Sequence, residues 1–432
     1  MKFLMTKDHL VQSLTKMVDV GTKNIKTDYE KAFRVTINVG DDKVNFLSSN
    51  GLLDAHWEVT SENDANLKCE DKGSATVDVS VAKKIAASIG GSSKDNIIAV
   101  SLEGDTSSAL YMKDADAKGK KMAKMVTFSE GHTFSIPKPR SGFSYVFESD
   151  EFQRGVSTAG KYVARRNYLP RYMMMCLHFL KDETRFVCGD GSRFGILGFK
   201  LDKSNPDIDD DAGKKFILPC DQAQIIAGLC SSEANKQIEV IYKNEQTCYI
   251  KPQESSLTLL LHGIPNDQYI SYEKHAFNFD AAKTIVDIKR ADFEEGMLLI
   301  GAVEDKERLK EGGFHHCSFI VGGGKAGVAS RSNFVVSEAR FQADFDCDAT
   351  VYGKPEYVSC YAHEYLKDVA QASDKPFVRF YCVDSERTII GEPIDPDDSK
   401  KNDMGAPGHK DGTNNPRLSF FFAAAADEEE EE

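Results

Sequence analysis

The sequence predicts an α+β protein made of three successive modules, each with two helices packed on antiparallel strands. Each third of the 432-residue chain opens with a short strand and an amphipathic helix. Several strands, a second short helix and further strands then follow. No sequence identity links the thirds, so the repeat is one of order and spacing. We place the modules at residues 1–138, 139–272 and 273–426, followed by an acidic tail at 427–432.

The first module is expected to hold its two helices among seven strands. The first helix, Lys7–Asp19, has Thr6 as its N-cap, and the second, Ser80–Ile89, ends at Gly90 and Gly91. The expected strands are Lys2–Met5, Phe33–Val39, Lys43–Ser48, Ala55–Thr60, Ile97–Glu103, Ser108–Lys113 and Met122–Thr127.

The middle module contains the most informative helix, which we expect Ser149 to cap. Phe152, Val156, Ala159 and Val163 recur at helical spacing and predict the face that packs on a core. The second helix and the strands of this module are expected at Asp221–Ser231 and at Tyr145–Phe147, Met173–Leu180, Arg185–Gly189, Arg193–Phe199, Lys215–Leu218, Ile238–Tyr242, Thr247–Lys251 and Ser256–His262.

The last module repeats the plan with helices at Lys289–Val303 and His363–Gln371. The expected strands are Ala276–Phe279, His316–Val321, Lys325–Ser330, Val335–Phe345, Val378–Val383, Glu386–Ile390 and Arg417–Phe422. Such a plan suggests sheets on the outside and all helices on one side.

Composition indicates an ordinary globular protein with packed cores. No apolar run approaches the roughly 20 residues of a membrane helix. The ten cysteines are scattered without a Cys-x-x-Cys pair, which favours reduced thiols and a cytoplasmic location. Taken as a sum, the net charge of −14 argues against nucleic-acid binding, but Asp427–Glu432 supply six of the negative charges. A protein acidic outside can still carry a basic surface elsewhere.

Cations gather on the predicted helices. The face opposite the apolar stripe of the middle module carries Arg154, Lys161 and Arg165 in a row, which predicts a surface facing phosphates. The alternative is that lysine and arginine simply solvate surface helices. The prediction of phosphate contact is weaker for the last module, because Glu294 and Glu295 share its first helix. The full set of candidates is Lys16, Lys23, Lys26, Lys83, Lys84, Arg154, Lys161, Arg165, Arg166, Arg171, Lys289 and Lys367.

A second feature is the glycine turn Gly189–Phe194, which leads into a strand. Taken alone, the Gly-Asp-Gly sequence indicates a tight turn and nothing more. Beside a basic helical face, it suggests a separate docking pocket.

At these residues the chain resembles the bacterial replicative sliding clamp, the beta subunit of DNA polymerase III. Met1–Phe3 with Asp8–Leu10 resembles the family's start, and Val77–Leu110 resembles the second half of its first domain. Gly189–Phe194 resembles the family's Thr-Asp-Gly-His-Arg-Leu turn, and His262–Tyr269 resembles its Gly-Arg-Phe-Pro-Asp-Tyr stretch. In the turn, Ser and Phe replace the family's His and Leu. Longer loops at 200–214, 306–313 and 392–416 also depart from the family, as suits a phage or an outlying bacterium.

The resemblance implies a homodimeric, head-to-tail ring of six clamp domains closed around duplex DNA, without catalytic activity or cofactor. Its implied partners are double-stranded DNA bound without regard to sequence, the replicative DNA polymerase, a clamp-loader ATPase and other proteins with a clamp-binding motif. The location would be the bacterial cytoplasm and nucleoid, or the host cytoplasm for a phage protein. No membrane is implied.

The resemblance also implies two protein contacts. A groove between the second and third modules would take a linear peptide and would be lined by Met174, Gly189, Gly191, Ser192, Arg193, Phe194, Pro265, Phe421 and Phe422. For the contact that closes the ring, our candidates are Ala109, Leu110, Met112, Ile300 and Val303, with an ordinary core role as the alternative.

Three other sequence motifs do not indicate a phosphate-binding loop or a metal site. Gly322–Lys325 lacks the spacing of a phosphate-binding loop, and no Ser or Thr follows the lysine. Asp207–Asp211 mimics a calcium loop, but its glycine comes one place late. His315–Cys317 lacks a second pair of metal ligands, so we expect no metal site. Two other functions stay open, a metal-dependent nucleic-acid hydrolase and a monomeric accessory factor that does not encircle DNA.

Overall fold

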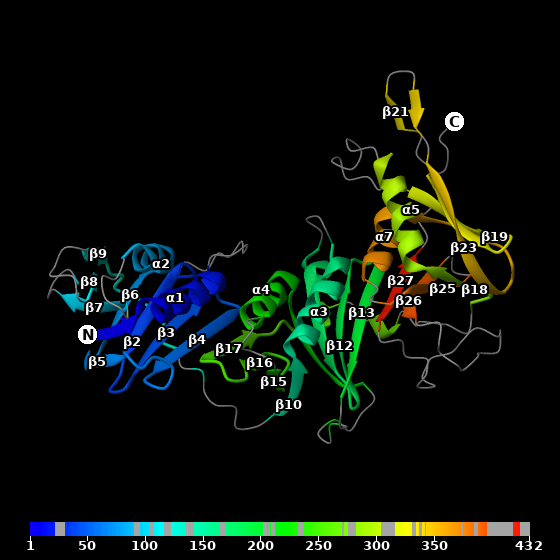
Figure 1. Cartoon of the computed structure of the whole chain (residues 1–432). Helices are drawn as coiled ribbons and strands as arrows, with labels where there is room; N and C mark the ends of the chain where they lie inside the picture. The colour runs from blue at the N-terminus through cyan, green and yellow to red at the C-terminus, as the bar shows by residue number, and fades with distance from the viewer. Residues whose placement is uncertain are drawn as a thin grey trace. The chain divides into compact units, whose positions relative to one another are not determined.

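A computed structural model shows an α+β chain with antiparallel sheets and, in the described residues, six α-helices (Figure 1). The residues described are 1–21, 31–89, 96–103, 108–115, 122–134, 136, 142–164, 169–201, 205, 208, 212–231, 237–269, 272–274, 282–303, 316–330, 334–336, 339–341, 343–372, 375–383, 388–394 and 418–423. The chain forms two compact units, residues 1–156 with 214–266 and residues 157–213 with 267–432. The middle module is thus shared between them, and the division into three domains stays a prediction.

The first compact unit contains α1 (Lys7–Gly21), α2 (Val79–Ser88) and α4 (Cys220–Cys230), together with the start of α3 (Ser149–Ala159). Its strands are β1 (Lys2–Thr6), β2 (Arg34–Val39), β3 (Lys43–Ser49), β4 (Leu53–Thr60), β5 (Lys68–Asp71), β6 (Gly73–Asp78), β7 (Ile97–Glu103), β8 (Ala109–Asp114), β9 (Met122–Val126), β10 (Phe143–Glu148), β14 (Lys214–Pro219), β15 (Gln237–Asn244), β16 (Thr247–Pro252) and β17 (Leu257–His262). One sheet has the order β5-β1-β7-β8-β9 and the other β10-β15-β16-β17-β4-β3-β2-β6. The pair β17–β4 therefore joins the middle module to the first in one continuous sheet.

The second compact unit contains α5 (Arg290–Ala302), α7 (His363–Ala372) and the 3-10 turns η1 (Gly160–Tyr162) and η2 (Pro170–Met173). Its strands are β11 (Met174–Phe179), β12 (Glu183–Gly189), β13 (Arg193–Lys200), β18 (Thr284–Lys289), β19 (His316–Gly322), β20 (Lys325–Ser330), β21 (Phe334–Val336), β22 (Ala339–Phe341), β23 (Asp344–Gly353), β24 (Tyr357–Ala362), β25 (Phe377–Val383), β26 (Thr388–Ile394) and β27 (Leu418–Ala423). The main sheet runs β11-β12-β13-β27-β26-β25-β18-β23-β20-β19-β24. Here β13–β27 joins the middle module to the last.

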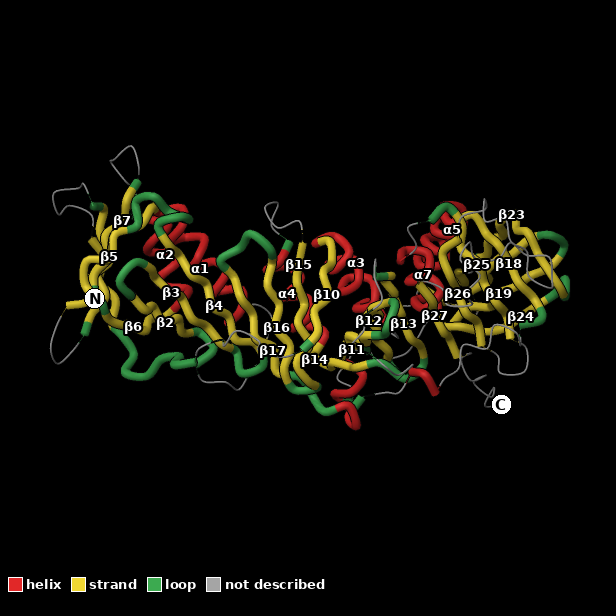
Figure 2. Tube along the Cα trace, turned by 90° about the horizontal axis from the view of Figure 1, so that it is seen from below, coloured by secondary structure: helices red, strands yellow, loops and turns green. Residues whose placement is uncertain are grey.

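The predicted helices are confirmed, and so are the apolar faces of α1 and α5. In α2 the prediction was wrong, because Val81, expected to point inward, is 45% exposed, and the buried stripe is Val79, Ala82 and Ala86. Leu10, Leu14 and Met17 of α1 are fully buried. This helix packs on α2, β3 and β4, and Figure 2 shows both helices on the same face of strands β2 to β4. In the second unit, Phe293 and Met297 of α5 are buried in the same way. In α1 and α5, apolar residues at helical spacing therefore identify the face that packs on the core.

Several boundaries differ from the prediction. Helix α3 ends at Ala159, and η1 follows it, so Val163 lies beyond the helix that was expected to include it. The strand that leads into α5 is β18, whereas the expected strand Ala276–Phe279 lies outside the described residues. Strands β5, β6 and β24 were not predicted. None of the described helices is long and apolar enough to cross a membrane.

Candidate functional site

The glycine turn is held by its own aspartate. Asp190 Oδ1 accepts hydrogen bonds from the backbone N–H groups of Ser192 and Arg193, at 3.0 and 3.1 Å. Gly191 has φ +95°, and a Cβ added there would meet the ring of Tyr172 at 2.8 Å. Only glycine suits both the backbone conformation and this close approach. The turn between β12 and β13 is therefore a fixed shape.

Arg193, at the first position of β13, is a buried ion and not a surface contact, because only 1% of it is exposed. Its Nε donates to Asp190 Oδ2 at 3.0 Å, and a terminal nitrogen donates to Asp368 Oδ2 of α7 at 2.5 Å. The other terminal nitrogen donates to the carbonyl of Lys161 at 3.1 Å. Burial alone would lower the pKa of Arg193, but Asp368 and Asp190 outweigh it and raise the pKa. The guanidinium thus ties the turn of the middle module to a helix of the last.

Aromatic rings complete this buried arrangement. The Arg193 guanidinium lies 5.0 Å from the ring centre of Tyr162 and 4.3 Å from that of Tyr365. Tyr162 also packs against Gly195, where a Cβ would overlap its ring. Burial, with the nearby Asp190 carboxylate, raises the pKa of Tyr365 to about 12. The turn sequence alone could not predict the roles of Tyr162 and Tyr365, because both come from other segments of the chain.

Two exposed apolar side chains flank Tyr172, whose ring faces the turn. Leu169 is 54% exposed and Met173 is 43% exposed. The backbone N–H of Tyr172 bonds the Leu169 carbonyl at 2.9 Å, so both residues belong to one short loop around η2. Only Arg171 and Met173 of this loop were predicted, as a candidate cation and as the start of a strand. The signal for a loop is Pro170, which favours a turn before the strand, with Leu169 and Met173 on either side.

The other predicted pocket residues lie in different surroundings. Met174 is half-buried at the start of β11, Ser192 is exposed, and Phe194 is buried. The backbones of Phe421 and Phe422 pair with β13 opposite Phe194 and Arg193. The structure thus brings these backbones and the turn together in the second compact unit. Pro265 belongs to the first compact unit, and Gly189 ends β12.

The hairpin between β3 and β4 in the first unit repeats the design of this turn. Asn50 Oδ1 accepts from the N–H groups of Leu52 and Leu53 at 3.0 and 2.9 Å, as Asp190 does in its own turn. Asn50 Nδ2 donates to Gln222 of α4 at 3.0 Å, so this turn too is tied to a helix of the following module. The tie is neutral here and ionic at Arg193. The repeat predicted from element order therefore extends to side-chain bonding.

The candidate phosphate-binding residues are spread unevenly. Lys23, Lys26, Arg165 and Arg166 lie outside the described residues. Lys84, Arg154, Arg171 and Lys289 are exposed, and Lys16, Lys83, Lys161 and Lys367 are partly exposed.

Several of these cations have local partners. Lys16 Nζ donates to the Leu229 carbonyl at 2.7 Å, in the last turn of α4, where a cation also suits the helix dipole. Lys289 lies 3.4 Å from Asp292, and the Arg171 guanidinium lies over the ring of Tyr172. Lys84 and Arg154 are exposed, and Lys83 lies beside Lys84 on α2, so these three residues stay candidates for phosphate contact.

Most candidates for the ring contact are core residues of their own units. Ala109, Leu110, Met112 and Ile300 are at most 3% exposed, and Val303 is half-buried. Strand β8 is an inner strand of its sheet, and the edge next to it is β9; in the second unit β24 is an edge strand. Exposed apolar side chains on or near α2, β9, α5 and β24 are Val81, Met122, Val126, Leu298, Leu299 and Val358.

The junction of β17 with β4 contains an ion pair that predicts a pH effect. His262 Nε2 donates to Asp54 Oδ2 at 2.9 Å, and this bond raises the pKa of His262 above its ordinary 6.5. Because the pKa of His262 is higher in the folded state than in the unfolded state, the ion pair adds to the free energy of unfolding in full below pH 6.5. This stabilisation is lost as the pH rises through the folded-state pKa. With 42% of the side chain exposed, we expect the gain to stay below about 1 kcal/mol.

Replacement His262→Gln removes this pair and its pH dependence. We expect the variant to unfold at lower urea concentration than wild type at pH 5.5 and at nearly the same concentration at pH 9. Equal differences at both pH values would contradict the assignment.

In the described residues, no group of three or more His, Cys, Asp or Glu side chains is placed to hold a metal ion.

No protein-family model matches the chain, and no curated protein matches its sequence. Solved structures match over nearly the full length. The DNA polymerase sliding clamp of Bacillus subtilis aligns with a TM-score of 0.78 at 12% identity, covering 99% of each chain.

The DNA polymerase III subunit beta of Pseudomonas aeruginosa aligns with a TM-score of 0.77 at 14% identity, covering 98% of this chain and 100% of that one. A sliding clamp from the same organism, bound to griselimycin, aligns with a TM-score of 0.74 at 14% identity and 99% coverage of both. The resemblance drawn from the sequence is thereby confirmed at the level of the fold.

Proposed function

We propose that this chain, which has the fold of the DNA polymerase III beta subunit, is a DNA sliding clamp. It would encircle duplex DNA as a homodimer and would tether the replicative polymerase and other replication and repair proteins, without catalysis of its own. The observation that carries this proposal is a match to sliding clamps across 98–99% of the chain. Loading by a clamp-loader ATPase belongs to the same proposal.

DNA contact in this proposal is weak and independent of sequence. Lys83, Lys84 and Arg154 would meet phosphates, while α5 carries Asp292, Glu294 and Glu295 against Arg290. Few phosphates are then neutralised at once, which lowers the affinity and its dependence on salt. A ring needs no stronger contact because it stays on DNA by topology.

Partner proteins would dock at the exposed loop beside the glycine turn. Leu169 and Met173 offer apolar surface next to a turn whose shape is fixed, which suits the apolar anchors of a short peptide. Ser192 is exposed and can set the direction of the bound chain. The family resemblance implies a peptide-binding pocket, and Leu169, Met173 and Ser192 are the residues that we propose contact the peptide in this chain.

Charged substitutions at this loop are expected to weaken partner binding. Burying an apolar side chain contributes about 1.5–3 kcal/mol, so Leu169→Glu with Met173→Glu should lower the affinity for a clamp-binding peptide of the polymerase more than tenfold. Fluorescence anisotropy of the labelled peptide measures this. Val146→Glu, a change at a similarly exposed apolar side chain on β10, is the control and should bind as wild type does. Unchanged affinity in the double variant would contradict the docking site.

The ring contact would join the edge of β9 to the edge of β24 in a second copy. Unpaired edges need a partner or protection, and Met122 and Val126 on β9 are 59% and 82% exposed. The charges are complementary as well, since Lys124 of β9 is exposed. Facing it in the second copy would be a groove of about 500 Å³ between α5 and β23, whose acidic lining residues are Asp292, Glu295, Asp346 and Asp348.

The solution mass tests the ring directly. Sedimentation equilibrium at micromolar concentration should give twice the chain mass of 47.9 kDa. A monomer at all accessible concentrations would favour an accessory factor that does not encircle DNA.

A further inference from the structure

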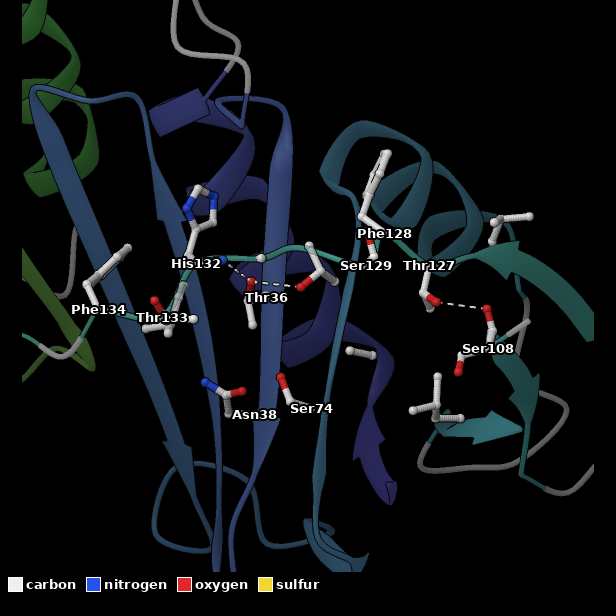
Figure 3. Close-up of a pocket in the computed structure, with 16 residues that line it drawn as sticks. Thr36, Asn38, Ser74, Ser108, Thr127, Phe128, Ser129, His132, Thr133 and Phe134 are labelled. Carbon is white, nitrogen blue, oxygen red and sulfur yellow. Dashed lines mark hydrogen bonds between the residues drawn. The ribbon is translucent and has the colours of Figure 1, made fainter. Parts of the chain in front are cut away.

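A groove of about 850 Å³ lies in the first compact unit, and of its lining residues only Val126 also belongs to the ring contact proposed above (Figure 3). Its floor is the face of β2 and β6, and its roof is residues 127–134, which follow β9 and are called the connector here. The lining residues are Thr36, Asn38, Leu47, Ser74, Ala75, Thr76, Leu102, Ser108, Val126, Thr127, Phe128, Ser129, Gly131, His132, Thr133 and Phe134.

The lining is polar but carries no formal charge. None of these residues is Asp, Glu, Lys or Arg, although such residues make up 28% of the chain. His132 is 4% exposed, and burial lowers its pKa, so it is neutral at pH 7. Hydroxyl and amide groups beside Phe128 and Phe134 would therefore meet an uncharged ligand, since an ion would lose its hydration without gaining a counter-charge.

The groove is preformed because the connector is fixed to the sheet. Phe128 N–H donates to the Thr76 carbonyl at 2.8 Å, and His132 N–H donates to Thr36 Oγ1 at 2.7 Å. Gly131 sits so close that a Cβ there would overlap Thr76 Oγ1. Figure 3 shows Asn38 and Ser74 together on the sheet below the connector, with His132 and Phe128 on its other side.

Backbone groups add a direction to the site. Strand β6 is the last strand of its sheet in the described residues, with β2 as its neighbour on one side. The Thr76 carbonyl bonds Phe128 and so points to the open side, and Ser74, two residues away, presents its N–H and carbonyl to the same side. A strand edge of this kind accepts an extended chain.

We propose that this groove binds an extended, uncharged peptide segment of a partner protein, which pairs with the backbone of β6 at Ser74 and meets the hydroxyl and amide groups of the lining. The proposal stands apart from the sliding-clamp proposal, because pairing with β6 at Ser74 requires neither the glycine turn nor a closed ring. Two partner segments would then be able to engage one chain at once.

Selection from a phage-displayed library of random ten-residue peptides tests the proposal, with the full-length chain as bait. Selected peptides should be rich in Ser, Thr, Asn and Gln and free of net charge, and each should be synthesised with a fluorophore. Ser74→Trp fills the groove at an exposed position and should lower their affinity more than tenfold. Gln253→Trp, at an exposed position in the same unit, is the matched control and should leave the affinity unchanged.

Asn38→Trp provides a second block if Ser74→Trp fails to fold. Affinity should change less than about twofold between 50 and 500 mM NaCl, because no ion pair is involved. Three outcomes would overturn the proposal. They are the absence of any selected peptide that depends on Ser74 or Asn38, peptides that bind through charge, and peptides lost instead on Leu169→Glu. Retention on DNA should be the same for Ser74→Trp and wild type, so failure here and failure of the clamp proposal are distinguishable.

Discussion

Replacing Arg193 with methionine is expected to lower the free energy of unfolding of the second compact unit by about 3–5 kcal/mol. Removing one member of a buried ion pair leaves a buried charge without compensation, and losses of this size follow. Here the Asp368 carboxylate, 4% exposed, would lose the guanidinium that now lies 2.5 Å away. Urea unfolding followed by circular dichroism measures the change.

Two further variants separate the ion pair from general damage. Arg171→Met removes an exposed arginine of the same unit and should change stability by less than about 0.5 kcal/mol. The pair Arg193→Met with Asp368→Leu should recover part of the loss, because no carboxylate of α7 is then left buried. A single Arg193→Met variant within 1 kcal/mol of wild type would show that the guanidinium does not tie the turn to α7.

The second large effect concerns the ring. Changing Leu298 and Leu299 together to aspartate is expected to raise the dissociation constant of the homodimer at least a hundredfold. The two side chains are 61% and 49% exposed in the single chain. Burying each would contribute about 1.5–3 kcal/mol, and the new carboxylates would add repulsion beside Asp292 and Glu295.

Sedimentation velocity over a dilution series measures this shift. Leu52→Asp, at an apolar position 37% exposed on the β3–β4 hairpin, is the control and should leave the dimer intact. A dimer that persists in the double variant would move the interface away from this end of α5.

Apolar periodicity was enough to predict where the helices lie, because a helix that packs on a core needs one buried stripe, which the sequence shows directly in α1 and α5. In α2 it misplaced the stripe, since Val79, Ala82 and Ala86 are buried and Val81 is exposed. The buried stripe of α1 includes Leu10, Leu14 and Met17, and that of α5 includes Phe293 and Met297. Strands β5 and β6 escaped prediction because exposed and polar residues dominate β5 and the first part of β6. Periodicity is a weak guide where a strand buries little.

The candidate site was only half predictable for a different reason. Aspartate and glycine in Gly189–Phe194 announce a tight turn, since their side-chain and backbone preferences act locally. The buried state of Arg193 depends on Asp368, which lies 175 positions further along the chain, and on two tyrosines from other segments. No local sequence pattern predicts contacts between residues so far apart in the chain, and an arginine in a turn is usually expected at the surface.

For the ring-contact candidates, the sequence could not separate a core residue from an interface residue. Ala109, Leu110 and Met112 were chosen as an apolar run on an expected edge strand, but β9 covers β8 and becomes the edge. An apolar side chain marks a core and an interface equally well in sequence. Exposure in the folded chain separates them, and it points to Met122, Val126, Leu298 and Leu299.

Retention on circular and on linear DNA shows whether the protein forms a closed ring around the duplex. The labelled protein would be placed on a nicked plasmid by a bacterial clamp loader and ATP, isolated by gel filtration, and divided into two portions. One portion is then cut once by a restriction nuclease. We expect the protein to stay on the circles at 200 mM NaCl and to leave the linear DNA by sliding off its ends. Equal retention on both forms, or release from both, would contradict a closed ring around the duplex.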